Sequence, residues 1–507
     1  MLKNILSNWF GMLVLGLVSV VLTPTMVHGL GNLHYGMWVL VGSFTDYSGL
    51  LDMGMRAAVF RYVAYFKGAN QRIALNQTFA TGVAIALSSM CVCMLISIGL
   101  SFILPSFFGF NGANRTTFSW IVVLIGVSVS VAIPGQFLSA YLRGLERFDL
   151  YNLGLIVHGL IRGALLLTLL KMGFGILSVA IGVLIMSVFF LVLHGFLVKW
   201  ADRHLKLSIE YLDRNRTREM FKYGVYCFIN NSGETLRYST DSSVIGRMLS
   251  IALITPFSIA SRLMEYFRVL IGGVGGPIMV RLSDLSGKVQ ETELSDEFLR
   301  ATRFSMLLCI FVGGMLILNG AALIRLWMGS AYLSSYPILV VLTVGYIGAW
   351  GQSPSGLLVF ARARHHKALS YWTLAEGGAN LVLSIALARK YGLLGIALGT
   401  AIPLLLSKAL IQPWYALRDL GMSAWTYFSV GLARSIFVGG LFLGGSWVLL
   451  HNAPPATSFF SLAAICVGQS VLFAAITYVF GLPAGDRTTV RIQGQRVATS
   501  LGIARSV

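Results

Sequence analysis

The sequence predicts an all-α, polytopic membrane protein of about 14 transmembrane helices, arranged as two pseudo-symmetric six-helix lobes and two further helices. Of its 507 residues, 56% are hydrophobic and only 11% are charged, whereas soluble domains carry roughly 25% charged residues. Apolar runs long enough to cross a bilayer recur from end to end. Because these runs leave little sequence between them, we expect no sizeable water-soluble domain. In addition, the two halves of the chain look related.

The individual spans follow from runs of about 20 apolar residues, each long enough for one helix across the hydrocarbon core. The predicted spans are 8–28, 35–55, 77–104, 117–140, 151–170, 174–198, 222–246, 251–280, 301–324, 336–360, 369–388, 393–416, 425–450 and 458–481. Lys3 and the first run resemble a signal peptide, but no small-residue cleavage site follows, so we expect this span to be retained.

Basic residues are distributed unevenly between alternate loops, and the formal net charge is +19. With the N-terminus inside, 26 Lys and Arg residues fall in predicted cytoplasmic segments and six fall in the opposite loops. Short loops rich in Lys and Arg remain in the cytoplasm, so both termini are expected there. The positive charge therefore orients the chain relative to the membrane lipids, and we expect no nucleic acid as a partner.

An internal repeat relates the two halves. Residues 144–173 and 363–392 share a basic loop, an apolar span and a Lys-x-Gly ending at an offset of 219, and nearly the same offset relates Pro134 to Pro354. Such repeats are typical of secondary transporters, whose binding site lies between the halves near the membrane midplane; chance similarity is the alternative. The predicted organisation is an N-lobe at 1–200, a cytoplasmic linker at 201–220, a C-lobe at 221–420, two additional transmembrane helices at 421–481 and a basic cytoplasmic tail at 482–507.

Two neighbouring predicted spans carry charged residues within apolar sequence. A charge at the bilayer centre costs at least ~2.5 kcal/mol, so it normally faces a bundle interior or a water-filled cavity. At ~100° per residue, the three charges of each span share one side of their helix. They are Glu234, Arg237 and Asp241 in the first span, and Arg262, Glu265 and Arg268 in the second. We expect one shared cavity; the alternative is that the charges only pair within each helix.

Two proline positions predict bends. Glycine weakens a helix and proline removes a backbone donor. The glycine-rich stretch that follows the second charged group contains Gly272, Gly273, Gly275, Gly276 and Pro277. We expect a hinge there and a second kink at Pro24, in the first span.

Three further ionisable residues lie in predicted spans. Asp46 could accept a coupling proton or pair with a cavity arginine, and a local structural role is the alternative. Arg162 and Lys408 occupy comparable places in the two halves, where each either contacts a ligand or supports the lobe interface.

The charge balance inside the spans favours an anionic ligand. Guanidinium groups are planar, bidentate donors that match phosphate and stay charged when partly desolvated. The candidate cationic cavity consists of Arg237, Arg262, Arg268, Arg162 and Lys408. The sequence contains no phosphate-binding loop and no metal-ligand cluster. We therefore expect no enzyme, metal or cofactor, and an energy source in a proton or sodium gradient, the membrane potential or the substrate's own gradient.

Five short runs stand out in the sequence: 31–38 (GNLHYGMW), 50–55 (LLDMGM), 144–148 (GLERF), 326–329 (LWMG) and 392–400 (GLLGIALGT). In their order and spacing, these runs resemble those of polysaccharide and O-antigen flippases of the multidrug/oligosaccharidyl-lipid/polysaccharide exporter superfamily. The resemblance covers about residues 5 to 420, and the two C-terminal helices resemble those of fourteen-helix members. It implies a V-shaped pair of lobes with a cationic cavity, to which Arg237, Arg262 and Arg268 would belong. It also implies alternating access in the bacterial inner membrane, which carries an undecaprenyl-pyrophosphate-linked oligosaccharide to the outer leaflet.

Two rival functions remain open. A cation-coupled multidrug exporter of the same superfamily would share the fold, although acidic and aromatic residues would suit its cavity better. A membrane glycan polymerase or ligase would be an enzyme, and such enzymes usually present a large outer loop that this sequence lacks. Besides the lipid-linked oligosaccharide and membrane lipids, other polysaccharide-assembly proteins are candidate partners.

Overall fold

The computed structural model describes residues 2–46, 54–288, 291–362, 366–452 and 454–482, which are almost entirely helical and contain no strand. The chain divides into two compact units. The first comprises Met1–Ile259 and Ser370–Thr400, and the second comprises Ala260–Leu369 and Ala401–Val507. The α9 and α13 helices therefore pass from one unit to the other.

The first unit contains most of the N-terminal half. Its helices are α1 (Leu2–Asp46), α3 (Met55–Gly68), α4 (Arg72–Phe107), α5 (Gly112–Gly144), α6 (Phe148–Lys171), α7 (Ile176–Ala201) and α8 (Arg214–Met248), with short 3₁₀ turns at Ile209–Tyr211 and Ile251–Leu253. α1 is interrupted at Gly31, whose φ of 73° is a left-handed conformation that favours glycine. Its two parts correspond to the first two predicted spans. The Pro24 position lies inside the helix, before this break.

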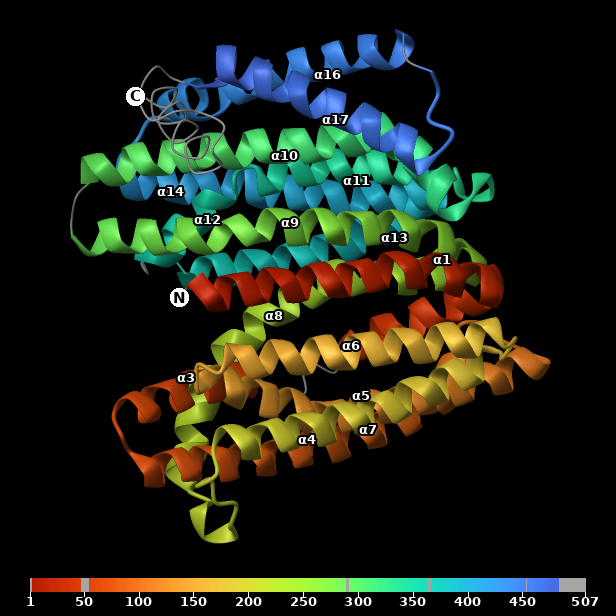
Figure 1. The fold of residues 1–507 in the computed structure, drawn as a ribbon, viewed down its shortest axis with the longest axis vertical. Coiled ribbons are helices and arrows are strands. Elements are labelled where there is room, and N and C mark those ends of the chain that lie inside the picture. The colour runs from red at the N-terminus through yellow and green to blue at the C-terminus, as the bar shows by residue number, and fades with distance from the viewer. Residues whose placement is uncertain (1, 47–53, 289–290, 363–365, 453, 483–507) are drawn as a thin grey trace, which may run out of the picture. The chain divides into compact units, whose positions relative to one another are not determined.

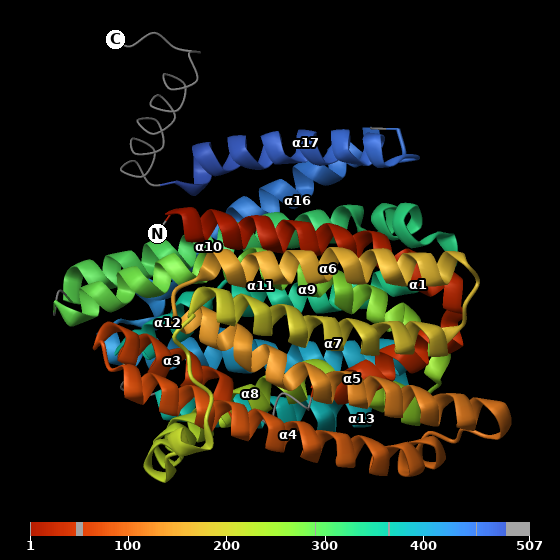
Figure 2. The ribbon, with the colours of Figure 1, turned by 60° about the horizontal axis from the view of Figure 1, so that its bottom comes forward.

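Within this unit, α5 is the central helix and packs against α4 and α7, while α1 packs against α6. Figures 1 and 2 show α4, α5 and α7 lying side by side. Phe79 and Tyr141 meet with ring centroids 4.8 Å apart, and the Phe137 ring lies 5.7 Å from Phe79. A Cβ at Gly82 would lie 2.1 Å from the Phe137 ring, so glycine is what lets this ring enter the core.

The second unit is built around α10. Its helices are most of α9 (Ile254–Gly287), α10 (Glu291–Met328), α11 (Ser335–Trp350), α12 (Ser353–Arg362), α14 (Gln412–Leu420), α15 (Ala424–Thr426), α16 (Arg434–Asn452) and α17 (Phe459–Ile476), with a 3₁₀ turn at Ser330–Tyr332 and π-helical segments at Leu406–Ile411, Tyr427–Ala433 and Thr477–Gly481. Most of α13 (His366–Leu405) belongs to the first unit, and both of its ends lie in the second. α13 is interrupted at Gly392, where φ is 57°. This break separates two predicted spans.

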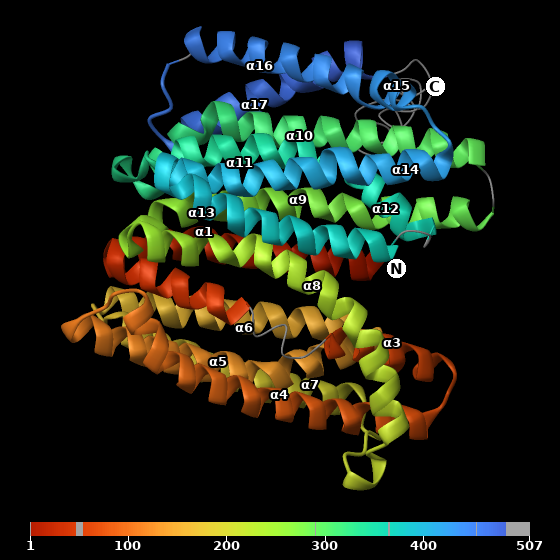
Figure 3. The same ribbon diagram turned by 180° about the vertical axis from the view of Figure 1, so that it is seen from behind.

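The two additional C-terminal helices pack against α10, beside which they lie in Figure 3. Inside this contact, the Asn319 amide donates to Gln469 Oε1 at 2.7 Å. Phe473 packs between Phe311 and Phe442, with centroid distances of 4.8 and 5.0 Å. A buried amide pair inside an apolar contact helps to specify which helix faces meet.

These observations confirm the fold class, a polytopic all-α membrane protein. Ten candidate spans meet the criteria of length and hydropathy among the described residues, and two of them, Val14–Phe44 and Ala368–Leu420, each extend over two predicted spans. α8 is absent from that set because it is too polar. α8 also begins at Arg214, inside the predicted linker. The count of 14 spans and the boundaries of the predicted lobes remain predictions.

Candidate functional site

A buried polar cluster forms where α8 meets α13, within the first unit. On α8, Gly233, Arg237 and Asp241 are spaced four residues apart and therefore share one face. Arg237 is 1% exposed and Asp241 is 7% exposed. Glu234 belongs to the same predicted stripe but is exposed. The structure thus divides the first predicted charged group into two buried members and one exposed member.

Two glycines allow the backbones of α8 and α13 to approach closely. A Cβ at Gly233 would lie 2.8 Å from the carbonyl of Thr373, and a Cβ at Gly377 would lie 2.9 Å from the carbonyl oxygen of Gly233. Small residues at such contacts let membrane helices pack at short range. The neighbouring side chains of the two helices are consequently pressed together.

Arg237 forms its ion pair across this contact. Its Nε faces Glu376 Oε1, and both side chains are 1% exposed. The Arg237 guanidinium also donates to the Tyr238 hydroxyl at 3.4 Å. Removing two charges from water costs several kcal/mol per ion, so each needs the other as a partner. The ion pair therefore joins two helices, and it is not the pairing within one helix, Arg237 with Glu234, that was the alternative.

Asp241 belongs to a second chain of hydrogen bonds one turn further along α8. The Asn380 amide donates to the Thr400 hydroxyl at 2.9 Å, and that hydroxyl donates to Asp241 Oδ2 at 2.9 Å. Gly399 lets the two parts of α13 converge, since a Cβ there would lie 2.4 Å from Ser384 Oγ. Among the described residues, no hydrogen-bond partner is found for the buried Asp241 Oδ1 or Asn380 Oδ1.

This arrangement offers several oxygen atoms to one small volume. A carboxylate, an amide carbonyl and a hydroxyl are the ligands that hard cations prefer, and a carboxylate can also bind a proton. Groups of three or more His, Cys, Asp or Glu that could hold a metal ion are not found in the described part of the chain.

The second predicted charged group lies on α9, in the second unit, and its side chains are partly exposed. Arg262 Nη1 donates to Glu265 Oε2 at 2.6 Å, and the two side chains are 41% and 43% exposed. Arg268, two turns from Arg262, is half-buried. α9 continues as one helix through Gly272, Gly273, Gly275, Gly276 and Pro277, so the predicted hinge remains a prediction.

The other predicted site residues lie on different elements. Arg162 is half-buried on α6, and Lys408 is half-buried in the π-helical segment Leu406–Ile411. Asp46 is the last residue of α1, and its side chain lies outside the described ones.

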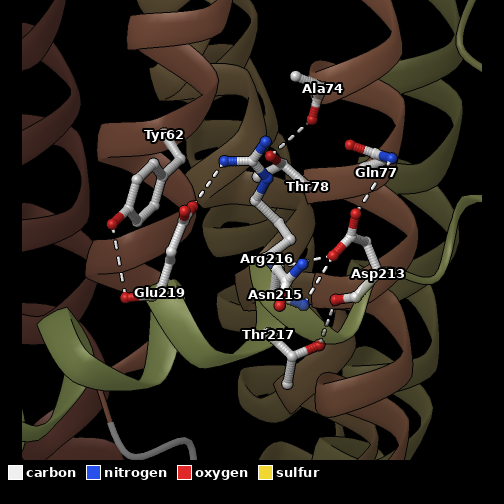
Figure 4. A network of polar contacts seen from close by, with 9 residues as sticks. All are labelled: Tyr62, Ala74, Gln77, Thr78, Asp213, Asn215, Arg216, Thr217 and Glu219. Carbon is white, nitrogen blue, oxygen red and sulfur yellow. Dashed lines mark hydrogen bonds and ion pairs between the residues drawn. The ribbon is translucent and has the colours of Figure 1, made fainter.

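A third polar network joins the start of α8 to α3 and α4 (Figure 4). Asp213 caps α8 by accepting from the backbone amides of Asn215 and Arg216 at 2.7 and 3.0 Å, and Gln77 on α4 donates to the same carboxylate at 3.4 Å. Arg216 donates to Glu219 at 2.7 Å. Such caps satisfy orphan amides and fix where a helix begins.

Sequence reasoning missed Glu376, Asn380 and Thr400. Glu376 lies within the predicted span 369–388, where the rule that a charge inside a span needs a partner would have found it. Asn380 and Thr400 carry no such signal, because uncharged polar residues are common in membrane helices.

A bundle of apolar helices that encloses ionisable side chains is the architecture of a multi-pass membrane transporter. The family model described as "Polysaccharide biosynthesis protein" matches residues 30–337, and this chain belongs to that family.

Three individual proteins that are similar to this chain are consistent with its membership of this family. The putative O-antigen transporter of Shigella flexneri is 20% identical over 420 residues, which are 82% of this chain and 97% of that protein. The structure of the lipid II flippase MurJ, in an inward closed conformation, is similar with a TM-score of 0.72 at 15% identity, over 94% of this chain and 99% of that one. An inward-facing multidrug resistance MATE family transporter of the MOP superfamily has a TM-score of 0.69 at 13% identity, over 80% of this chain and 94% of that one. These findings confirm the resemblance, and they indicate a transporter of the flippase type rather than an enzyme.

Proposed function

We propose that this protein moves an undecaprenyl-pyrophosphate-linked oligosaccharide from the inner to the outer leaflet of the bacterial cytoplasmic membrane by alternating access. Membership of a polysaccharide biosynthesis family and the O-antigen transporter relative support a glycan cargo. The fold shared with a lipid II flippase supports a lipid-linked form of that cargo. Other polysaccharide-assembly proteins are proposed partners on either side of this step.

One observation carries the proposal at the level of residues. Arg262 keeps 41% of its side chain exposed although α9 belongs to a candidate membrane span. A guanidinium that is accessible inside a span can bind a phosphate group with two parallel hydrogen bonds. Glu265, its partner three residues away, is equally accessible and can release it. Arg268 is the second proposed phosphate contact, and Arg162 and Lys408 are secondary candidates.

The test is a complementation assay for surface glycan, normalised to the amount of protein in the membrane. Each charge-assisted hydrogen bond contributes roughly 1.5–3 kcal/mol, so Arg262→Ala or Arg268→Ala should weaken binding about 10- to 100-fold. Arg268→Lys should recover only part of the activity, because lysine lacks the bidentate fork. Arg281→Ala is the matched control, since Arg281 pairs with Asp284 on the same helix at the same spacing and with similar exposure.

Normal glycan export by a well-expressed Arg262→Ala/Arg268→Ala variant would overturn the anion-cavity proposal. If loss of the protein instead leaves a cationic drug inside the cell and surface glycan unchanged, the multidrug exporter is correct. Accumulation of single-repeat glycan that is already on the outer surface would indicate a polymerase.

The orientation of this flippase is proposed from the basic residues, with both termini in the cytoplasm. A reporter phosphatase that is active only outside the cytoplasm should be silent when fused at residue 214 or after residue 482. Activity of either fusion would reverse the orientation.

Cation coupling is proposed for Asp241. The acceptor oxygens of Asp241, Asn380 and Thr400, two of which have no hydrogen-bond partner among the described residues, support the binding of sodium or a proton there. Sodium binding should raise the unfolding temperature of the purified protein in NaCl relative to KCl, and Asp241→Asn should abolish that difference. A proton should leave the NaCl and KCl values equal while transport requires a pH gradient.

Full transport by Asp241→Asn under the physiological gradients would remove Asp241 from coupling. The same assay on Asp46→Asn tests the coupling role predicted for Asp46.

A further inference from the structure

The segment that joins α7 to α8 exposes apolar side chains although it lies outside the candidate membrane spans. Within residues 203–212, which we call the linker segment, Leu207 is 63% exposed, Ile209 is 85% exposed and Leu212 is 47% exposed. Trp200, in the last turn of α7, is also half exposed. Three exposed apolar side chains within six residues would lose hydrophobic free energy in water unless something covers them.

The linker segment lies beside the helices of its unit, at the edge of a predicted span. Its Lys206 backbone amide donates to Asn76 Oδ1 at 3.5 Å, and Leu205 packs against the core of the unit. Asn76 stands at the start of the apolar run 77–104, where the headgroup region of a bilayer begins. Figures 1, 2 and 3 agree that the segment projects sideways from α4.

The charges around the segment are sorted by sign. Two acidic residues face inward. Asp202, 9% exposed, accepts from Arg72, and Asp213 caps α8. The basic residues face outward. Exposed basic side chains in and near the segment are Lys199, Arg203, Lys206, Arg214 and Arg218, and the exposed acidic side chains over the same stretch are Glu210 and Glu219. The accessible surface is therefore positive as well as apolar.

We propose that the linker segment is an interfacial anchor that inserts Leu207, Ile209 and Leu212 among the lipids of one leaflet, while Arg203 and Lys206 bind anionic phospholipid headgroups. Apolar side chains flanked by lysine and arginine are the pattern that lies in the plane of a membrane interface, and a tryptophan at that level is typical. Because Arg203 and Lys206 are positively charged, the proposed anchor should prefer a leaflet that contains anionic lipids. The anchor is independent of the transported substrate.

The test places a fluorophore on Ile209→Cys in the full chain, with the five native cysteines replaced by alanine, in nanodiscs that carry lipids with a quencher near the headgroup. The nanodiscs contain phosphatidylcholine alone or mixed with phosphatidylglycerol. Gln71→Cys is the control, an exposed position that directly precedes α4. We expect stronger quenching at 209 than at 71, and a further increase with phosphatidylglycerol.

Charge reversal completes the test. Each basic residue near an anionic surface contributes about 1 kcal/mol, so Arg203→Glu/Lys206→Glu should lower the inserted population by at least tenfold in phosphatidylglycerol. Equal quenching at 209 and 71 would overturn the anchor. Equal quenching in both lipids would overturn recognition of anionic headgroups. Rapid disulfide formation between two copies at position 209, without quenching, would assign the apolar surface to self-association instead.

Discussion

Arg237 on α8 and Arg262 on α9 differ in burial and in ion-pair partner, although their sequence surroundings are similar. Each is an arginine within a membrane helix, with an acidic residue three positions away. Yet Arg237 is 1% exposed and paired with Glu376 on α13, whereas Arg262 is 41% exposed and paired with Glu265 on its own helix.

The difference assigns the two arginines different tasks. A buried ion pair is held together because either charge alone would be left in a low-dielectric interior, so breaking the pair costs more than the pair contributes. An exposed pair is screened by water and contributes little to stability. Arg237 is thus suited to hold α8 against α13, and Arg262 is suited to exchange its partner for a ligand. Four experiments can sharpen or break this comparison.

The largest effect is expected from breaking the buried pair. Arg237→Ala and Glu376→Gln should each lower the free energy of unfolding by about 3–5 kcal/mol, because each leaves an uncompensated buried charge. The measurement is reversible unfolding in mixed micelles. The double variant Arg237→Met/Glu376→Leu should recover most of the loss. If Arg237→Ala lowers the free energy of unfolding no more than Arg262→Ala does, the contrast between the two regions is wrong.

The next effect tests the close contact that buries the pair. Gly233→Ala or Gly377→Ala places a Cβ within 3 Å of the facing backbone, and such overpacking costs about 1–3 kcal/mol of unfolding free energy. Gly276→Ala is the control. A Cβ there meets no atom within 4 Å, so alanine should be neutral or stabilising by up to about 1 kcal/mol. Equal responses at Gly233 and Gly276 would contradict the close approach.

Asp202 provides a case between the two extremes, since its side chain is 9% exposed while its partner Arg72 is 42% exposed. Burial alone would raise the pKa of Asp202, but the hydrogen bonds from Arg72 and Tyr141 outweigh it and hold the pKa below its usual value of 3.8. A depressed carboxylate pKa stabilises the fold above the unfolded-state pKa, and that stabilisation is lost as the pH falls through the folded-state pKa.

Asp202→Asn should therefore be less stable than the wild type by about 1 kcal/mol at pH 7. The two proteins should converge as the pH falls below 3.8. Unfolding free energies measured from pH 7 to pH 3 check this. A constant difference across the whole range would show that the charge of Asp202 is not the cause.

The smallest effect on stability is expected at the exposed pair. Arg262→Ala and Glu265→Gln should change the unfolding free energy by less than about 1 kcal/mol, although both residues are proposed to act in transport. Expression level and unfolding midpoint, measured beside glycan export, separate the two roles. A loss of several kcal/mol in Glu265→Gln would make this pair structural, like that of Arg237.

The sequence by itself determined the fold class, most helix positions and the presence of charges inside the spans. These properties depend on composition and on local periodicity, since a bilayer demands long apolar helices and a helix repeats every 3.6 residues. It also determined that Arg237, Asp241, Arg262 and Arg268 needed an explanation, because charge inside an apolar run is costly wherever the helix lies.

Only the tertiary structure decided which partner each charge finds. Arg237 could reach Glu234 on its own helix, and the sequence offers no preference between that residue and Glu376. Which partner Arg237 finds depends on the Gly233–Gly377 contact, which brings the backbones of α8 and α13 close together. Asp241 likewise meets Thr400 because α13 turns back at Gly392. Long-range contacts decide whether a charge is buried or open, and local periodicity carries no information about them.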